Sequence, residues 1–232
     1  MAHIHLEDGA FTPFWIIVWS LIAAGLIGVT LLLIRRQKIP PRLVAIAAMC
    51  ASVGFAVFQV EIPTPIGPVH MNFTPLIGIL VGPGLGSLVV VVINIFSAAI
   101  GHGGWGMIGA NSLVNVLEVS LAFYTFRLLR VKMRRSYYWS GWGSATIALT
   151  ASAFFVVLII AVSEIQGSQL SKEEMIGNLM VLAVLNAVAG AVEGIVTGYV
   201  VSFLGRVRPD LLERRVRLES EKMSPVAASE AT

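Results

Sequence analysis

The apolar residues of this chain fall into long runs that are separated by short polar or basic segments. Five runs cover roughly residues 13–34, 43–58, 107–126, 142–162 and 175–204, and a sixth stretch covers 73–100. A helix that crosses a membrane needs about 20 apolar residues. The pattern therefore predicts a membrane protein with several spanning helices.

The sixth stretch, 73–100, is too long for one ordinary span and contains the sequence Gly82-Pro83-Gly84. Proline inside a helix costs about 3 kcal/mol and glycine about 1 kcal/mol. We therefore predict two spans here. The first is short and draws residues from the preceding loop, 61–72, which is rich in proline and glycine.

The basic residues favour the same count of seven spans. With seven, the segments 35–42 and 127–135 and the chain from 206 onward all lie on one side, and they hold every Lys and Arg of the 16 except Lys172. Cytoplasmic loops carry an excess of Lys and Arg. The predicted fold is an all-α membrane protein, a bundle of about seven transmembrane helices with its N-terminus outside and its C-terminus in the cytoplasm.

Composition narrows the class further. The chain of 232 residues is 56% hydrophobic and only 12% charged, whereas soluble domains average about 25% charged residues. A soluble globular domain and a disordered chain are both excluded. We expect an extracytoplasmic segment at 1–12, the membrane domain at 13–208, and a disordered cytoplasmic tail at 209–232. The net charge of +3 then reflects cytoplasmic loops, and no nucleic-acid partner is expected.

Histidines supply the first candidate chemistry. In the seven-span topology His3, His5, His70 and His102 all lie at the outer face. Imidazole is a good ligand for nickel, cobalt, zinc and copper. The histidines therefore indicate a transition-metal site that faces outward.

The N-terminus is more specific evidence for a metal site than the placement of the histidines, because the chain begins Met1-Ala2-His3. Alanine in second place favours removal of Met1, which leaves the amine of Ala2, the amide nitrogen of His3 and its imidazole as three planar donors. His70 is then the natural fourth, and a square of nitrogens points to Ni(II) or Cu(II). If Met1 stays, its amine, two amides and the His3 imidazole supply four nitrogens without His70. The alternative is a solvated terminus without a metal.

Polar residues within the apolar runs have two interpretations. For Asn94, Asn186 and Glu193 we favour hydrogen bonds between helices. Asn111 and Asn115 are four residues apart and share a helix face near the outer loop 101–106. These two either orient a metal ligand or serve packing alone.

Glycines recur at intervals of four in two places along the chain. Such spacing lets helices approach closely, and we assign both sets to packing within the chain: Gly78, Gly82 and Gly86, and Gly190, Gly194 and Gly198. The sequence has no GxxxxGK[ST] nucleotide loop and no HExxH zinc motif. The chain is therefore not expected to hydrolyse ATP by that route.

Four segments carry a resemblance to a known family. They are the start Met-Ala-His-Ile, the stretch GPVHMNFTPLIGIL at 67–80, VGPGLG at 81–86, and GHGGWGMIGANSLVNV at 101–116. The chain resembles the substrate-binding membrane component of cobalt and nickel energy-coupling factor (ECF) transporters, the CbiM/NikM family. His102 stands where the family has an acid, and Ala2 displaces histidine from second position.

The resemblance implies a seven-helix protein that takes up Ni(II) or Co(II) as substrate and uses no organic cofactor. Its implied metal ligands are the amine of Ala2, His3 and His70, with Met1 and His5 as further candidates and with Asn111, Asn115 and His102 around them. The implied partners are a membrane coupling subunit, two ATPase subunits and a small accessory membrane protein. The implied location is the plasma membrane of a prokaryote.

Two rival functions remain open. An intramembrane metalloenzyme or hydrolase would use His70, His102 and Glu118, and would need an ionisable pair on facing helices, whereas the sequence suggests only isolated acids. An ECF component for an organic vitamin would need a pocket lined by aromatic residues and would not use the free amine.

Overall fold

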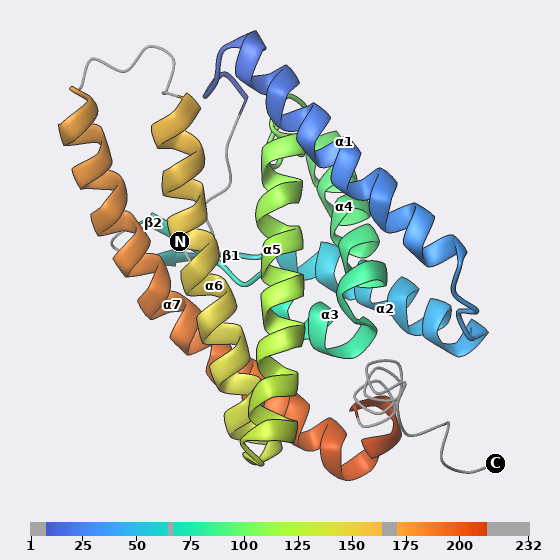
Figure 1. The fold of residues 1–232 in the computed structure, drawn as a ribbon. Coiled ribbons are helices and arrows are strands. Elements are labelled where there is room, and N and C mark those ends of the chain that lie inside the picture. Colours follow the sequence, from blue (N-terminus) through green and yellow to red (C-terminus); the bar gives the residue numbers. More distant parts are fainter. Residues whose placement is uncertain (1–7, 65–66, 164–170, 213–232) are drawn as a thin grey trace.

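A computed structural model describes residues 8–64, 67–163 and 171–212 of the chain, and this part is almost entirely helical. The α-helices are α1 (Pro13–Arg35), α2 (Pro41–Phe58), α3 (Thr74–Val81), α4 (Pro83–Ala99), α5 (Ile108–Arg127), α6 (Tyr137–Ser163) and α7 (Lys172–Val207). A short π-helical turn, η1 (Leu128–Lys132), extends α5. Figure 1 shows α5 at the centre of the bundle.

Proline marks the start of four helices. Pro13, Pro41, Pro75 and Pro83 each stand in the first two positions of α1, α2, α3 and α4. The ring fixes a helical φ, and the missing N–H is one that has no partner in a first turn anyway. α7 begins instead with a capping box, in which Ser171 and Glu174 exchange hydrogen bonds.

Five helices of the described chain are long and apolar enough to cross a membrane, namely α1, α2, α5 with η1, α6 and α7. The predicted division of 73–100 is confirmed, because α3 ends and α4 begins at Gly82, whose φ of +79° suits glycine. With eight and 17 residues, α3 and α4 are shorter than the other five.

The segment before α3 differs from the expectation of a purely α-helical fold. Residues that we assigned to a loop form an antiparallel hairpin of β1 (Glu61–Thr64) and β2 (Gly67–His70). α3 therefore gains no helical turns from this segment, contrary to the prediction. Prolines, which cannot continue a helix, recur in this stretch and pair across the hairpin as Pro63 opposite Pro68.

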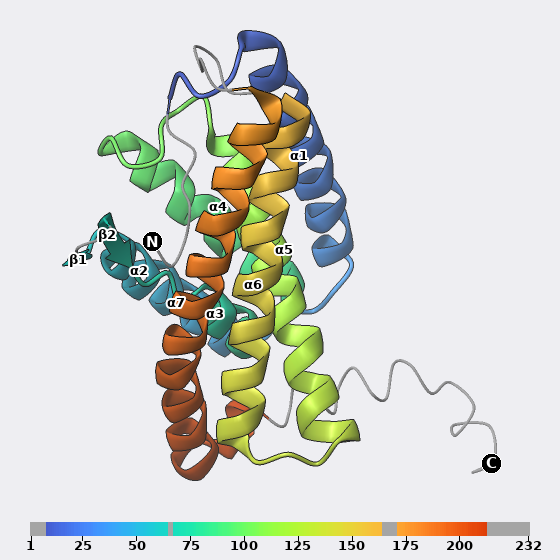
Figure 2. The same ribbon diagram turned by 90° about the vertical axis from the view of Figure 1, so that its left-hand side faces the viewer.

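Glycines set the closest helix contacts. A Cβ at Gly78 would meet the backbone carbonyl of Val119 on α5, and one at Gly198 would lie 2.9 Å from the backbone oxygen of Tyr138 on α6. The glycine sets therefore serve packing within the chain, as predicted. Figure 2 shows α6 and α7 side by side along most of their length.

The basic segments gather toward one end of the bundle. The α1–α2 and α5–α6 connections and the end of α7 lie in the lower half of Figure 1, away from the start of α1. Arg42 at the start of α2 forms an ion pair of 2.6 Å with Asp210, just after α7. The described fold extends to the buried Leu212, four residues beyond the predicted end of the membrane domain.

Candidate functional site

The predicted metal donors fall mostly outside the described part of the chain. Met1, Ala2, His3 and His5 lie in the segment 1–7, which the structure does not describe. His70 ends β2, and the description of this hairpin extends to its backbone only. The ligand set therefore stays a prediction.

Asp8, which the sequence analysis did not single out, ties the N-terminal segment to the loop between α4 and α5. Its carboxylate accepts hydrogen bonds from the backbone N–H of Trp105 (3.0 Å) and of Gly106 (2.7 Å). Gly104 has φ +65°, and a Cβ there would collide with the Asp8 carboxylate. Three residues further on, Phe11 is buried in the core with Met107 and Val114. The chain is thus anchored at Asp8 and again at Phe11.

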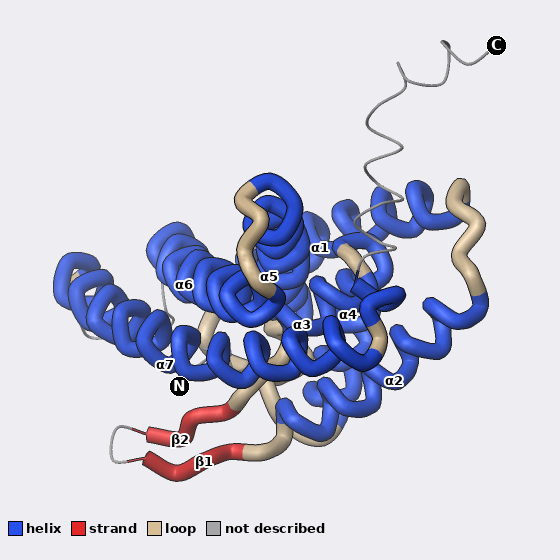
Figure 3. The backbone as a smooth tube through the Cα atoms, turned by 90° about the horizontal axis from the view of Figure 1, so that it is seen from below, coloured by secondary structure: helices blue, strands red, loops and turns tan. Residues whose placement is uncertain are grey.

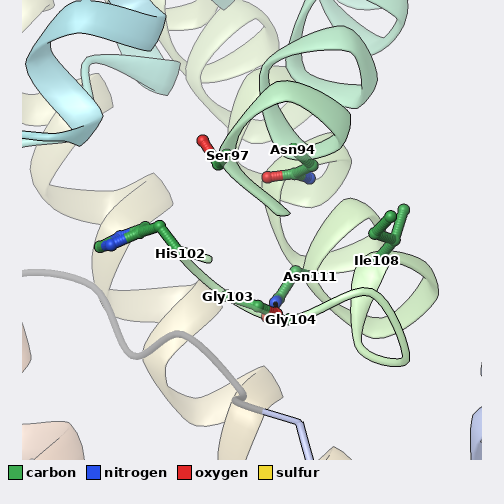
Figure 4. Close-up of a pocket in the computed structure, with 7 residues that line it drawn as sticks. All are labelled: Asn94, Ser97, His102, Gly103, Gly104, Ile108 and Asn111. Atoms are coloured by element: carbon green, nitrogen blue, oxygen red, sulfur yellow. Dashed lines mark hydrogen bonds between the residues drawn. The ribbon is translucent and has the colours of Figure 1, made fainter. Parts of the chain in front are cut away.

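A polar pocket lies next to this loop, between α4 and α5 (Figure 4). Its lining residues are Asn94, Ser97, His102, Gly103, Gly104, Ile108 and Asn111. In Figure 4 the ring of His102 points away from Asn111. The structure therefore brings His102 to the predicted end of α5 without directing its ring at the asparagine.

The asparagines have distinct contacts. Asn111 donates a hydrogen bond to the carbonyl of Gly103 (3.1 Å), and so supports the loop between α4 and α5. Asn115 donates to Asn94 (2.9 Å), which in turn donates to Ser112 (3.2 Å). Asn94 joins two helices, as predicted. A role of Asn111 and Asn115 around a metal stays a prediction.

Two buried glutamates from different helices accept hydrogen bonds from the loop that leads into α3. Glu118 on α5 and Glu193 on α7 are 0% and 2% exposed. Glu193 accepts the backbone N–H of Asn72 (3.2 Å) and of Phe73 (3.1 Å). Glu118 accepts the side-chain amide of Asn72 (2.9 Å) and the hydroxyl of Thr74.

This cluster corrects one expectation from the sequence. Glu118 and Glu193 are not isolated acids, because Asn72 links them, and Glu193 also accepts backbone N–H groups from the loop before α3. No spacing in the sequence relates residues 75 positions apart, so only the fold could reveal the pair. Asn186 is buried, and among the residues that the structure describes neither polar atom of its side-chain amide has a hydrogen-bond partner, so the predicted helix-to-helix bond is not found there.

Across the part of the chain that the structure covers, no group of three or more His, Cys, Asp or Glu side chains could hold a metal ion. The contacts described above instead anchor the chain at Asp8, five residues after His3, and at Asn72, two residues after His70.

Long apolar helices around a buried polar network define a multi-pass membrane protein. A solved structure of a transition metal transporter has this fold, with a TM-score of 0.76 and 19% identity over 93% of this chain and 99% of that one. The model of the family described as the cobalt uptake substrate-specific transmembrane region, CbiM, matches residues 5–211. The chain therefore belongs to the CbiM family, as the resemblance implied.

Curated relatives agree with this assignment. The chain is 27% identical over 229 residues to a protein of Archaeoglobus fulgidus described as a fused nickel transport protein, NikMN, and the match covers 97% of this chain and 73% of that protein. It is 31% identical over 136 residues to the cobalt transport protein CbiM of Clostridium tetani, covering 57% of this chain and 56% of that protein. Both relatives are described as transport proteins, which favours a transporter over the intramembrane hydrolase.

Proposed function

We propose that this chain is the substrate-specificity component of an ECF-type importer, and that it captures Ni(II) or Co(II) at the outer face of the plasma membrane. ATP hydrolysis belongs to two separate ATPase subunits, joined by a membrane coupling subunit and a small accessory membrane protein. Family membership over residues 5–211 supports this assignment.

The proposed donors are the amine of Ala2 after loss of Met1, the amide and imidazole of His3, and the imidazole of His70. Four nitrogens in one plane suit Ni(II) better than Co(II), which usually accepts more ligands. His5 is the spare imidazole. A deprotonated amide also lowers the net charge of the bound site, which reduces the cost of placing it near the hydrocarbon.

The observation that carries this proposal is that the chain next to each histidine-bearing segment is hydrogen-bonded to α5 or to the loop just before it. Asp8 binds the loop before α5, and Asn72, two residues after His70, binds Glu118 within it. From Ile108 to Glu118 a helix rises about 15 Å. The five residues from His3 to Asp8 span at most about 17–18 Å when extended. The covalent reach therefore allows His3 to approach the level of His70.

The experiment is to measure nickel binding before and after release of the N-terminus. A protein that carries a cleavable N-terminal extension should bind no nickel tightly, and cleavage that leaves Ala2 first should restore one bound ion per chain. Intact mass spectrometry reports both the N-terminal residue and the metal stoichiometry. Tight binding of one nickel by the uncleaved, folded protein would show that the amine is not a ligand.

A further inference from the structure

The loop between β2 and α3 is held by side chains from two helices that are far apart in the chain. Figure 3 shows the hairpin beside α7. Two residues after its end, Asn72 is fully buried; its backbone N–H and side-chain amide N–H donate hydrogen bonds, and its side-chain oxygen accepts one from Thr74. These bonds connect the residues next to His70 to α5 and α7 at once.

Phe73 shows that the loop is held in a conformation that its own sequence does not favour. Its φ of +51° lies in the left-handed region, which is costly for a bulky side chain. Such a residue persists only where its surroundings over-determine the backbone. Glu193 supplies that constraint, since its two oxygens accept the N–H groups of Phe73 and of Asn72.

Burial makes the constraint strict. A buried carboxylate is tolerated only when hydrogen bonds replace the water that it has lost. Glu193 and Glu118 therefore need the donors on this loop as much as the loop needs their oxygens. A shift of the loop that separates these donors from Glu193 or Glu118 would leave a buried polar group without its hydrogen bond.

We propose that Glu193 and Glu118 are positioning residues for His70, and that they set its place in the metal site through Asn72. This inference rests on the proposed function, in which His70 binds nickel or cobalt. Groups that orient a metal ligand commonly change metal affinity about 10- to 100-fold when they are mutated. Of the two glutamates, Glu193 should have the larger effect on metal affinity, because it binds the backbone two residues from His70.

The test is a double-mutant cycle on nickel affinity in the full-length protein. Glu193→Gln keeps the size of the side chain but turns one acceptor into an amide that faces a backbone N–H. We expect about a 10- to 100-fold loss of affinity. In the background of His70→Ala, which retains the three N-terminal nitrogens, Glu193→Gln should change affinity by less than about threefold, because its effect passes through His70.

The results distinguish a failure of the proposed donor set from a failure of the positioning role. If His70→Ala binds nickel as tightly as the unaltered protein, the proposed donor set is wrong and the positioning role fails with it. If His70→Ala weakens binding but Glu193→Gln causes the same loss in both backgrounds, only the positioning role is wrong. The matched control is Thr197→Val, a buried change of equal size one turn along α7, which should leave affinity unaltered.

A second set of variants distinguishes a specific effect on His70 from a general loss of folding. Asn72→Asp removes the amide that donates to Glu118 and places two carboxylates together, so it should weaken nickel binding. Adding Glu118→Gln restores a donor opposite the new carboxylate, and the double variant should recover most of the lost affinity. If the double variant binds no better than Asn72→Asp although both are folded, the bond between these positions does not place His70.

Discussion

Replacing Asp8 with alanine tests whether the anchor of the N-terminal segment matters for metal capture. The change removes two hydrogen bonds to the N–H groups of Trp105 and Gly106. Hydrogen bonds to a charged group contribute about 1.5–3 kcal/mol each when they are shielded from water. Because this carboxylate is exposed, we take about 1.5 kcal/mol for the pair.

That loss lowers the fraction of molecules in which the N-terminal segment is in place. Apparent affinity falls in proportion to the competent fraction, and about 1.4 kcal/mol corresponds to a factor of ten. We therefore expect Asp8→Ala to bind nickel more weakly by up to about tenfold, as measured by competition with a chelator in detergent. The melting temperature should fall only slightly, because the helices are not affected.

A second change probes the same contact from the other side. Gly104→Ala adds a Cβ that collides with the Asp8 carboxylate at a residue with φ +65°, so it should weaken binding to a similar extent. The control is Asp210→Ala, which removes an exposed carboxylate that pairs with Arg42 near the other end of the bundle. Unchanged nickel affinity in both Asp8→Ala and Gly104→Ala would refute the anchoring role.

Two further predictions concern the fold. Gly78→Ala places a methyl group against the rigid backbone of Val119, so we expect a loss of about 1–3 kcal/mol and a lower melting temperature in detergent. Gly25→Ala is its control, because nothing lies within 4 Å of the added Cβ; a melting temperature lowered equally in both would contradict the packing argument. Asn94→Ala removes the bond from Asn115 and should cost about 0.6–2 kcal/mol, measured by thermal unfolding; no change would mean that this bond adds nothing.

Local features of the chain were predictable from the sequence. Apolar runs gave the long helices to within a few residues, and Gly82 with Pro83 marked the break between α3 and α4. These features act over a few neighbouring residues, so the pattern of the chain contains them. The hairpin at 61–70 was not predicted, because four-residue strands carry too little alternation to distinguish them from a loop.

The contacts around the candidate site were beyond the reach of sequence patterns. Asp8 binds residues about 97 positions away, and Glu193 binds the loop at 72–73 from about 120 positions away. Such pairs depend on how helices pack, which no local spacing encodes. The three N-terminal donors could be proposed because the chelate of an amine, an amide and a histidine is a local arrangement.

The shortness of α3 has a consequence for the membrane itself. Eight residues rise about 12 Å, whereas the hydrocarbon core is about 30 Å thick. Extended backbone continues the chain before this helix, and lipid does not tolerate such backbone unless protein or water covers it. Protein or water, instead of lipid, therefore has to surround the chain where the hairpin meets α3. Under the proposed function, a cation bound beside this segment would exchange its hydration waters for protein nitrogens without first crossing the full width of the hydrocarbon.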